Sequence, residues 1–550
     1  MTIYVALGQH VDFWHSYRGD SPTEDGFGHD FDVIGRSLDV LERHPGLVCD
    51  WDWECARALR DALPHDPALL ARLVSRVRDS GDVVRHISWA GEILSALTED
   101  EFTESFRRSR ADLTATFGAE NLVEGCYPQE CMYTPALPRR LRGAGVEWVS
   151  LFYGACGFTA FRRDVRLDGA EAYNPLRLFT PEGDAWITLV PMYNHGDLLD
   201  FGDMNQWLEA VAESCGDDDG LLHVSFDADS ITWPPFLEAT AAALDTLDFV
   251  RCCTVDRYLE THAPLRDVTL HRDLADGAMD GYGNWSEKPV NFRMWTSIVE
   301  GRRRGAPVER RLLAAKTTNF GLATPLLHPD RMATVDGFVA ELGTAELARP
   351  ALGSGAPDLP AGRIEAHRSA RFSAPEPFGD GGIAFWVTVT FGDDVDEDAV
   401  EPCAIVLDWA LPVTVHKADF CGARSTYDIV EDQDSVNNHL TPEWAAFGAA
   451  DGSGVLVAFD ERVLAGPAAL PLRVRGGEVR VNPFGTYWGR YPDMHPEWTG
   501  GSGQAHEVVP LVGSHYHSSS PAFAGATLTF RLGVVAFEGP EPSPPPAWPD

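Results

Sequence analysis

Positive charge, and lysine above all, is scarce in this sequence. Its 550 residues include 44 Lys+Arg against 83 Asp+Glu, which gives a formal net charge of −39. Only three of the basic residues are lysines, Lys288, Lys316 and Lys417. Proteins that bind nucleic acids neutralise phosphates with basic patches, so we expect no nucleic-acid partner. A hydrophobic content of 44%, with 16 Trp, excludes a disordered acidic chain.

Long apolar runs and cysteines are also rare. The sequence has no run of about 18 apolar residues, and its amino-terminal stretch lacks the basic region of a signal peptide. Ten Cys are too few for a disulfide scaffold, and Cys126 and Cys131 have no second pair to complete a structural zinc site. We expect a cytoplasmic protein with reduced thiols and no membrane partner. The negative charge indicates a halophilic host, because high salt screens repulsion between carboxylates; an acidic protein of a GC-rich genome is the alternative.

Short apolar runs alternate with amphipathic stretches in the first half of the chain. These runs span residues 3–7, 47–51, 83–89, 122–127, 148–153, 186–193, 221–226 and 249–255. One intervening helix is well marked, because Thr98 and Glu101 form a capping-box pattern and four apolar residues between 102 and 117 follow on one helical face. Strands separated by helices are typical of a parallel sheet. We predict an α/β fold, a seven-stranded-type (β/α) barrel over residues 1–264.

The second half of the chain changes pattern twice. Residues 265–349 have helical periodicity and predict a helical domain. After a Pro/Gly/Ser-rich linker at 350–357, alternation with period two predicts a β-sandwich domain that ends at residue 539. The proline-rich residues 540–550 predict a tail with little capacity to pack.

Polar and aromatic residues follow five of the predicted strands. In β/α barrels the active site lies at the carboxyl ends of the strands. The residues at those ends are His10, Asp12 and Trp14; Asp52, Trp53 and Glu54; Glu130; His195; and Asp227 and Asp229. Each alone could be a helix cap or a solvated loop residue, but together they predict one site at the mouth of the barrel.

Glu130 and Asp227 are the predicted catalytic pair. Glu130 lies between a strand and a helix expected to begin at Thr134, where a carboxylate stays ionised as a nucleophile must. The alternative is a loop glutamate favoured by the helix dipole. Asp227 ends another strand, and two carboxylates facing across a barrel mouth are what glycoside hydrolysis requires.

The other residues of this set predict substrate contacts. Trp14, Trp53, Trp89 and Trp233 could stack against sugar rings, although partly buried packing is the first expectation for each one alone. Four polar residues complete the predicted substrate-binding set: Asp52, Glu54, His195 and Asp229.

His10 and Asp12 admit two interpretations. An imidazole and a carboxylate two residues apart can bind one divalent cation, Zn²⁺ or another, together with ligands from other strands. Alternatively, both side chains hydrogen-bond a sugar directly. His195 and His223 are possible further ligands, and the apolar neighbours of His223 favour a satisfied strand histidine instead.

Several of these motifs resemble known carbohydrate-active enzymes. The segment GCYPQECMYTP at 125–135, followed by LPRRLRGAG at 137–145, is similar to the nucleophile region of the family 57 glycoside hydrolases, which implies Glu130 as nucleophile. VSFDAD at 224–229 looks like that family's acid/base region and implies Asp227 as the acid, although Asp229 stands where the family has Glu. His10-Val-Asp12 is instead similar to the zinc-binding His-x-Asp pair of family 38 α-mannosidases. In that family the nucleophile is an Asp, from which Glu130 departs.

Three functions are consistent with these patterns. The first is a retaining α-glycoside hydrolase or transglycosidase, with Glu130 as nucleophile and Asp227 as acid and then base. The second is a metal-dependent carbohydrate deacetylase built around His10 and Asp12. The third is a non-catalytic carbohydrate-binding protein on a glycosidase-like scaffold. All three predict a carbohydrate partner.

Overall fold

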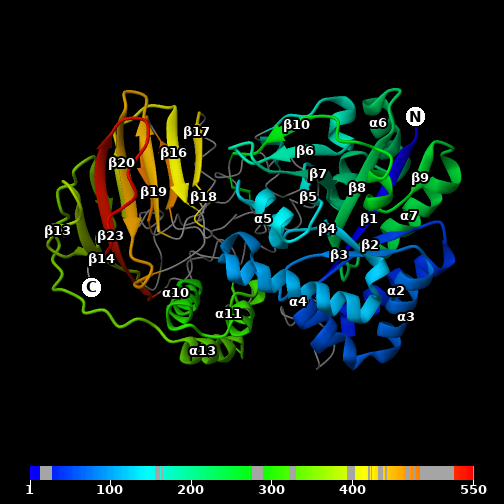
Figure 1. The fold of residues 1–550 in the computed structure, drawn as a ribbon, viewed down its shortest axis with the longest axis horizontal. Helices are drawn as coiled ribbons and strands as arrows, with labels where there is room; N and C mark the ends of the chain where they lie inside the picture. Colours follow the sequence, from blue (N-terminus) through cyan, green and yellow to red (C-terminus); the bar gives the residue numbers. More distant parts are fainter. Residues whose placement is uncertain are drawn as a thin grey trace.

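A parallel barrel and an antiparallel sandwich lie at opposite ends of the molecule, with helices between them (Figure 1). The computed structural model describes residues 1–12, 28–154, 161–163, 165–271, 273–274, 289–320, 330–392, 403–418, 422, 424–430, 438–439, 443–464, 470–475, 477–483 and 525–548.

Seven parallel strands form the closed barrel. They are β1 (Ile3–Val11), β2 (Cys49–Trp53), β3 (Val83–His86), β4 (Leu122–Cys126), β5 (Trp148–Phe152), β7 (Trp186–Tyr193) and β8 (Gly220–Asp227). They follow the order β7-β5-β4-β3-β2-β1-β8, and pairing between β7 and β8 closes the ring. Both faces of these strands are buried, which explains their nearly continuous apolar runs. The predicted seven-stranded barrel is confirmed.

Three further strands extend the barrel sheet outside the ring. These are β6 (Leu176–Phe179), β9 (Val250–Cys252) and β10 (Asp267–Thr269). The last predicted run, 249–255, therefore supplies β9 beside β1 rather than a strand of the ring. Strand β10 pairs with β6, so the sheet extends beyond the predicted domain boundary at residue 264.

Helices cover the outside of the barrel. They are α2 (Gly28–Arg43), α3 (Pro67–Asp79), α4 (Glu99–Phe117), α5 (Leu137–Gly143), α6 (Met204–Cys215), α7 (Trp233–Thr246) and α8 (Val255–Leu259). Short helical segments are η1 (Cys55–Ala62), η2 (Leu63–His65), η3 (Leu94–Ala96), η4 (Ala119–Asn121), η5 (Gln129–Cys131), η6 (Phe161–Arg163), η7 (Gly169–Tyr173) and η8 (His195–Asp200). The predicted capping box of α4 is confirmed, because the backbone N–H of Thr98 donates to Glu101 (3.0 Å) and the predicted apolar face of the helix is buried.

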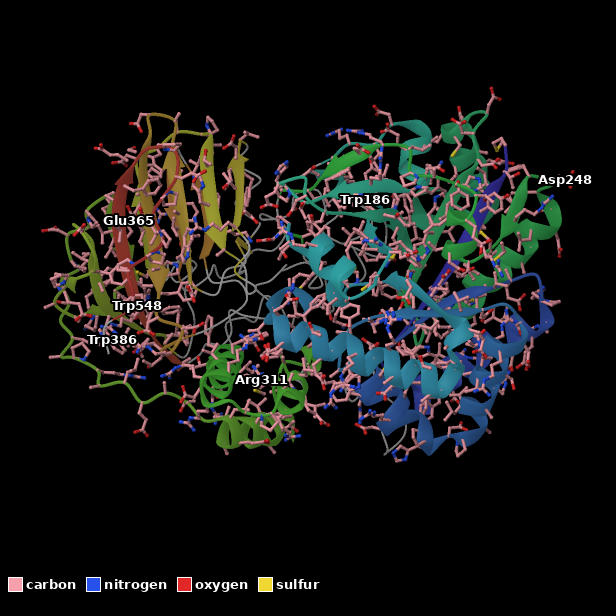
Figure 2. All side chains as sticks on the ribbon, in the orientation of Figure 1. Trp186, Asp248, Arg311, Glu365, Trp386 and Trp548 are labelled. Carbon is pink, nitrogen blue, oxygen red and sulfur yellow. The ribbon has the colours of Figure 1, made fainter. Side chains whose placement is uncertain are left out.

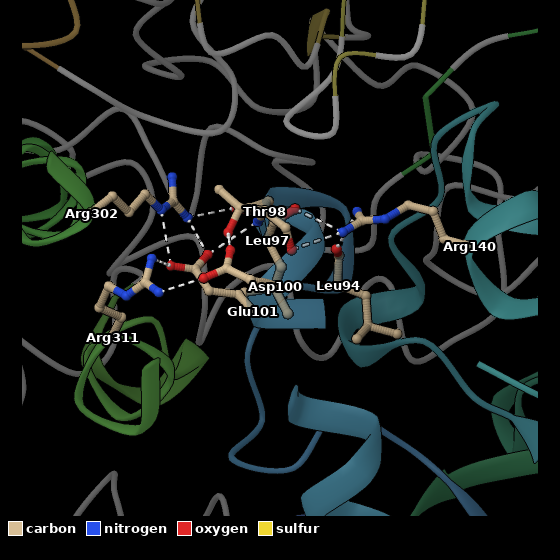
Figure 3. A network of polar contacts seen from close by, with 9 residues as sticks. Leu94, Leu97, Thr98, Asp100, Glu101, Arg140, Arg302 and Arg311 are labelled. Carbon is tan, nitrogen blue, oxygen red and sulfur yellow. Dashed lines mark hydrogen bonds and ion pairs between the residues drawn. The ribbon is translucent and has the colours of Figure 1, made fainter. Parts of the chain in front are cut away.

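The helices after the barrel are α10 (Pro289–Arg304), α11 (Val308–Ala314) and α13 (Asp330–Leu342), with η9 (Thr317–Asn319) between the last two. Helices α10 and α11 dock against α4 through a polar network around Glu101 (Figure 3). Arg302 of α10 and Arg311 of α11 both pair with the Glu101 carboxylate, at 2.7 and 2.9 Å. The predicted helical region is thus tied to the side of the barrel.

Two antiparallel sheets form the carboxyl-terminal part. The larger contains β12 (Arg371–Phe372), β13 (Glu376–Pro377), β14 (Ile383–Thr390), β16 (Val413–Ala418), β17 (Arg424–Ile429), β19 (Trp444–Ala449), β20 (Ser453–Phe459) and β23 (Thr527–Glu538). The smaller contains β11 (Arg363–Ala366), β15 (Cys403–Leu407), β18 (Asn438–His439), β21 (Leu470–Arg475) and β22 (Glu478–Val481). Apolar side chains of both sheets share one core, as predicted for a β-sandwich.

The proline-rich tail packs against the sandwich. Figure 2 shows Trp548 at the sandwich. Its ring lies 4.5 Å from the Phe378 ring between centroids, and the Arg531 guanidinium stands 5.2 Å from the Trp548 ring. The expectation that this segment would not pack is therefore wrong for its described part, because one tryptophan beyond the prolines supplies an apolar anchor.

No described helix is long and apolar enough to cross a membrane. The eight cysteines in the described part of the chain are free thiols, Cys126 and Cys131 among them.

Candidate active site

One row of paired residues crosses the carboxyl ends of four neighbouring strands. Asp227 of β8 is the register partner of His10 of β1, His10 is the partner of Asp52 of β2, and Asp52 is the partner of Arg85 of β3. Register partners in a parallel sheet present their side chains on the same face. Residues far apart in the sequence therefore meet in a single charged row.

Three of the mouth residues form a compact cluster. His10, Asp12 and Asp227 each offer one ligand atom, and these atoms all lie within 4.8 Å of one another. His10 Nε2 stands 3.5 Å from Asp12 Oδ2, while His10 Nδ1 is hydrogen-bonded to Asp52. Burial alone would lower the pKa of His10, but the nearby carboxylates of Asp52 and Asp12 outweigh it and raise that pKa well above the usual range. A proton or a cation at this imidazole offsets the negative charge around it.

The cluster fits a divalent cation. It combines one imidazole with two carboxylates, a donor set suited to Zn²⁺ and similar ions. A metal-binding histidine usually donates its second ring N–H to a carboxylate, and Asp52 accepts at that position. The sequence pointed to His10 and Asp12, and the structure adds Asp227 as a candidate third ligand that the sequence did not assign. The signal for it is the strand order, because adjacent β1 and β8 bring Asp227 beside His10.

Glu130 lies in η5, shortly after β4, and β4 is on the other side of the ring from β8. Its backbone is left-handed (φ 55°, ψ 24°), and so is that of Cys131 (φ 50°). They are the two non-glycine residues with positive φ in the part of the chain that the structure describes. Such conformations cost of order 1–3 kcal/mol each and cluster at functional sites.

Contacts from outside the barrel brace this strained turn. The Gln129 side chain donates to the Thr317 hydroxyl of η9 (3.3 Å), and Tyr133 exchanges backbone hydrogen bonds with Leu274 (2.8 and 3.0 Å). Helix α5 begins at Leu137, later than predicted. Because the helix-dipole effect falls off within the first turn, the dipole of α5 contributes little at Glu130.

Glu54 and Asp52 are internal to the site. Glu54 is fully buried and forms an ion pair with Lys316, which follows α11. Burial raises the pKa of Glu54 to about 7, although Lys316 opposes that shift. Asp52 is fully buried between His10 and Arg85. Because neither carboxylate is exposed, neither can contact a sugar directly. Glu54 instead binds Lys316, and Asp52 binds His10 and Arg85.

The tryptophans are placed differently from the sugar-stacking prediction. Trp53, Trp89 and Trp233 are 0%, 1% and 1% exposed. Trp53 stacks on Trp51 (5.8 Å between ring centroids) and lies on the face of β2 opposite Asp52. The Trp89 indole donates to Asp112 of α4 (2.9 Å). Burial therefore favours the packing interpretation for all three.

Four residues named as candidates in the sequence remain. Trp14 lies outside the described residues. Asp229 is buried just beyond β8. His195 is buried with Nε2 at 2.8 Å from the Thr232 hydroxyl, and burial lowers its pKa to about 4. His195 is not a member of the three-residue cluster. His223 accepts from Arg85 (3.0 Å) inside the barrel, as expected of a satisfied strand histidine.

The fold of this chain is similar to that of a solved structure. No protein-family model and no curated protein matches the chain. Among solved structures, an alpha-mannosidase from Enterococcus faecalis V583 matches with a TM-score of 0.55 and 11% identity, over 98% of this chain and 88% of that chain. The chain has the fold of that enzyme.

Two further solved structures also match. They are a 4-alpha-glucanotransferase from Thermococcus litoralis (TM-score 0.47, 13% identity, 84% of this chain and 87% of that chain) and a GH57-type branching enzyme from Pyrococcus horikoshii (0.41, 12%, 62% and 88%).

Proposed function

We propose that this protein is a retaining α-glycosidase or transglycosidase. One observation supports the proposal most: Glu130 follows β4 and Asp227 ends β8, and these two strands lie on opposite sides of a closed seven-stranded barrel. Active sites of β/α barrels lie at the carboxyl ends of the strands. The α-mannosidase fold over almost the whole chain supports it.

The proposed reaction divides between two carboxylates. Glu130 attacks the anomeric carbon and forms a glycosyl ester, while Asp227 donates a proton to the departing oxygen. Asp227 then takes a proton from water or from an acceptor hydroxyl, which attacks the anomeric carbon and releases Glu130 with retention of configuration. This chemistry requires carboxyl groups about 5 to 5.5 Å apart. The left-handed turn at Glu130 supports the proposal, since strain of this kind persists where the surroundings hold a functional side chain in place.

A second candidate is a metal-dependent carbohydrate deacetylase, favoured by the cluster of His10, Asp12 and Asp227. A divalent ion held there would polarise a substrate oxygen and lower the pKa of a bound water. The two candidates use Asp227 in incompatible ways, because a ligand carboxylate must stay deprotonated while an acid must carry a proton. Metal binding that requires Asp227 would therefore remove it from the role of acid.

The test is turnover of aryl α-glycosides in molar KCl, with and without a chelator. We expect chelator-resistant release of the aryl group, and a loss of roughly 10⁴-fold or more in kcat for Glu130→Gln. Glu124→Gln is the matched control, because Glu124 lies on β4, the strand that precedes Glu130, but pairs with Arg110 (2.6 Å). It should keep nearly full activity.

Three results would contradict the proposal. Equal activity of Glu130→Gln and Glu124→Gln would show that Glu130 is not the nucleophile. Chelator-sensitive acetate release without glycoside cleavage would favour the deacetylase. Sugar binding without turnover of any α-glycoside would indicate a carbohydrate-binding protein.

A further inference from the structure

Arg85 is a fully buried arginine directly below the mouth of the barrel. Its Nε and one Nη reach the same oxygen of Asp52, at 2.9 and 2.7 Å. The other carboxylate oxygen of Asp52 is hydrogen-bonded to His10 Nδ1. One buried carboxylate thus connects the guanidinium to the imidazole of the cluster.

The guanidinium itself has a fixed position. Arg85 donates to Ser225 Oγ (2.9 Å) and to His223 Nε2 (3.0 Å), both on β8. It also lies over the Tyr127 ring, 5.4 Å from its centroid. A Cβ at Gly8 would stand 2.3 Å from Ser225 Oγ and 2.9 Å from an Nη of Arg85. Glycine at this position of β1 leaves the room that the arginine occupies.

We infer that Arg85 is a positioning residue for the cluster of His10, Asp12 and Asp227, and that it sets the affinity of that cluster for a divalent cation. Arg85 holds Asp52 in the orientation that accepts the Nδ1–H of His10. This hydrogen bond directs His10 Nε2 toward the other two ligands. The inference rests on the metal site described under the second candidate function, and it concerns binding of the ion whichever reaction the site performs.

The probe is Zn²⁺ or Co²⁺ alone, titrated calorimetrically against a competing chelator. Loss of a partner behind a metal ligand typically costs 10- to 100-fold in affinity, so we expect Arg85→Met to weaken binding by about 10- to 100-fold. Arg85→Lys should fall between that variant and the wild type, because one ammonium cannot replace the guanidinium contacts. Ser225→Ala, which removes one anchor of Arg85, should weaken binding less.

Arg76→Met is the matched control. Arg76 is likewise buried and pairs with a buried aspartate, Asp82 (2.9 and 3.0 Å), but that pair braces Trp51 rather than His10. Its loss should lower the stability of the barrel and leave metal affinity within about twofold, as a side chain with no contact to the ligands should.

A double-mutant cycle with Asp52→Asn separates positioning from general damage. If Arg85 acts through Asp52, Arg85→Met should cost far less affinity in the Asp52→Asn background than in the wild type. Equal losses in both backgrounds would overturn the inference, as would equal losses for Arg85→Met and Arg76→Met. If Arg85→Met fails to fold, Arg85→Lys and Ser225→Ala decide by the same criteria. A wild-type protein that binds neither ion would overturn the inference together with the metal site. If Glu130→Gln instead proves not to lower turnover, the proposed glycosidase fails but the inference about Arg85 stands.

Discussion

Replacing Glu101 by Gln should be among the most damaging single changes outside the mouth of the barrel. Glu101 is 1% exposed, and its carboxylate accepts from Arg302 (2.7 and 3.0 Å), from Arg311 (2.9 Å) and from the backbone of Thr98 (3.0 Å) (Figure 3). Three of these hydrogen bonds come from guanidinium groups, so the substitution removes the counter-charge that both arginines share. Arg311 keeps its second partner, Asp100 (2.6 Å).

The size of the effect follows from that burial. Breaking a buried ion pair from one side typically costs 3–5 kcal/mol, so we expect Glu101→Gln to lower the free energy of unfolding by about 3–5 kcal/mol. Glu104→Gln, on the same helix, is the matched control. Glu104 pairs with Arg107 (2.6 Å) and Arg108 (2.7 Å) near the surface, and loss of an exposed pair costs about 1 kcal/mol or less.

The effect should also depend on pH. Burial alone would raise the pKa of Glu101, but Arg302 and its other partners outweigh burial and lower that pKa below the ordinary value of 4.5. A group with a depressed pKa stabilises the folded state fully above its unfolded pKa and loses that contribution as the pH falls through the folded value. The difference between wild type and Glu101→Gln should therefore be constant from pH 7 to about pH 5 and shrink below pH 4.5.

The assay is urea unfolding in molar KCl, followed by tryptophan fluorescence at several pH values. A Glu101→Gln midpoint no lower than that of Glu104→Gln would refute the reasoning. A difference from wild type that grows as the pH falls would contradict the sign of the pKa shift.

Two further predictions concern charge. The unfolding midpoint of the wild-type protein should rise from low to molar KCl, because salt screens repulsion in a chain with a net charge of −39; an unchanged or falling midpoint in thermal melts would contradict a halophilic adaptation. Lys417 of β16 forms an ion pair with Asp273, and both side chains are buried. Lys417→Met should therefore destabilise the protein by about 3–5 kcal/mol, because it leaves the buried Asp273 carboxylate without its partner. The double variant Lys417→Met/Asp273→Asn should recover part of this loss in the same melts. A double variant as unstable as the single one would show that the unpaired Asp273 is not the cause.

Local patterns were sufficient for the elements of the barrel. The strand runs and the capping box at Thr98 and Glu101 depend on residues close in sequence, and the structure confirms them. The alternation of side chains along β2 also predicts that Asp52 and Trp53 lie on opposite faces of the strand. An inward Asp52 therefore implies an outward Trp53, which packs beneath the helices rather than at the mouth.

The left-handed turn at Glu130 had no comparable signal. The residues around it are neither glycine nor asparagine, the types that adopt positive φ most readily. The turn is held by Thr317 and Leu274, more than 100 residues away along the chain. Contacts between residues so far apart cannot be predicted from local sequence patterns.

The sequence by itself determined which segments become strands and helices, and which strand ends carry acids and histidines. Only the tertiary structure decided that Asp227, His10, Asp52 and Arg85 form one row. The physical reason is that closure of the barrel sets the register between strands that are distant in the chain, and a shift of one residue would turn each of these side chains to the other face.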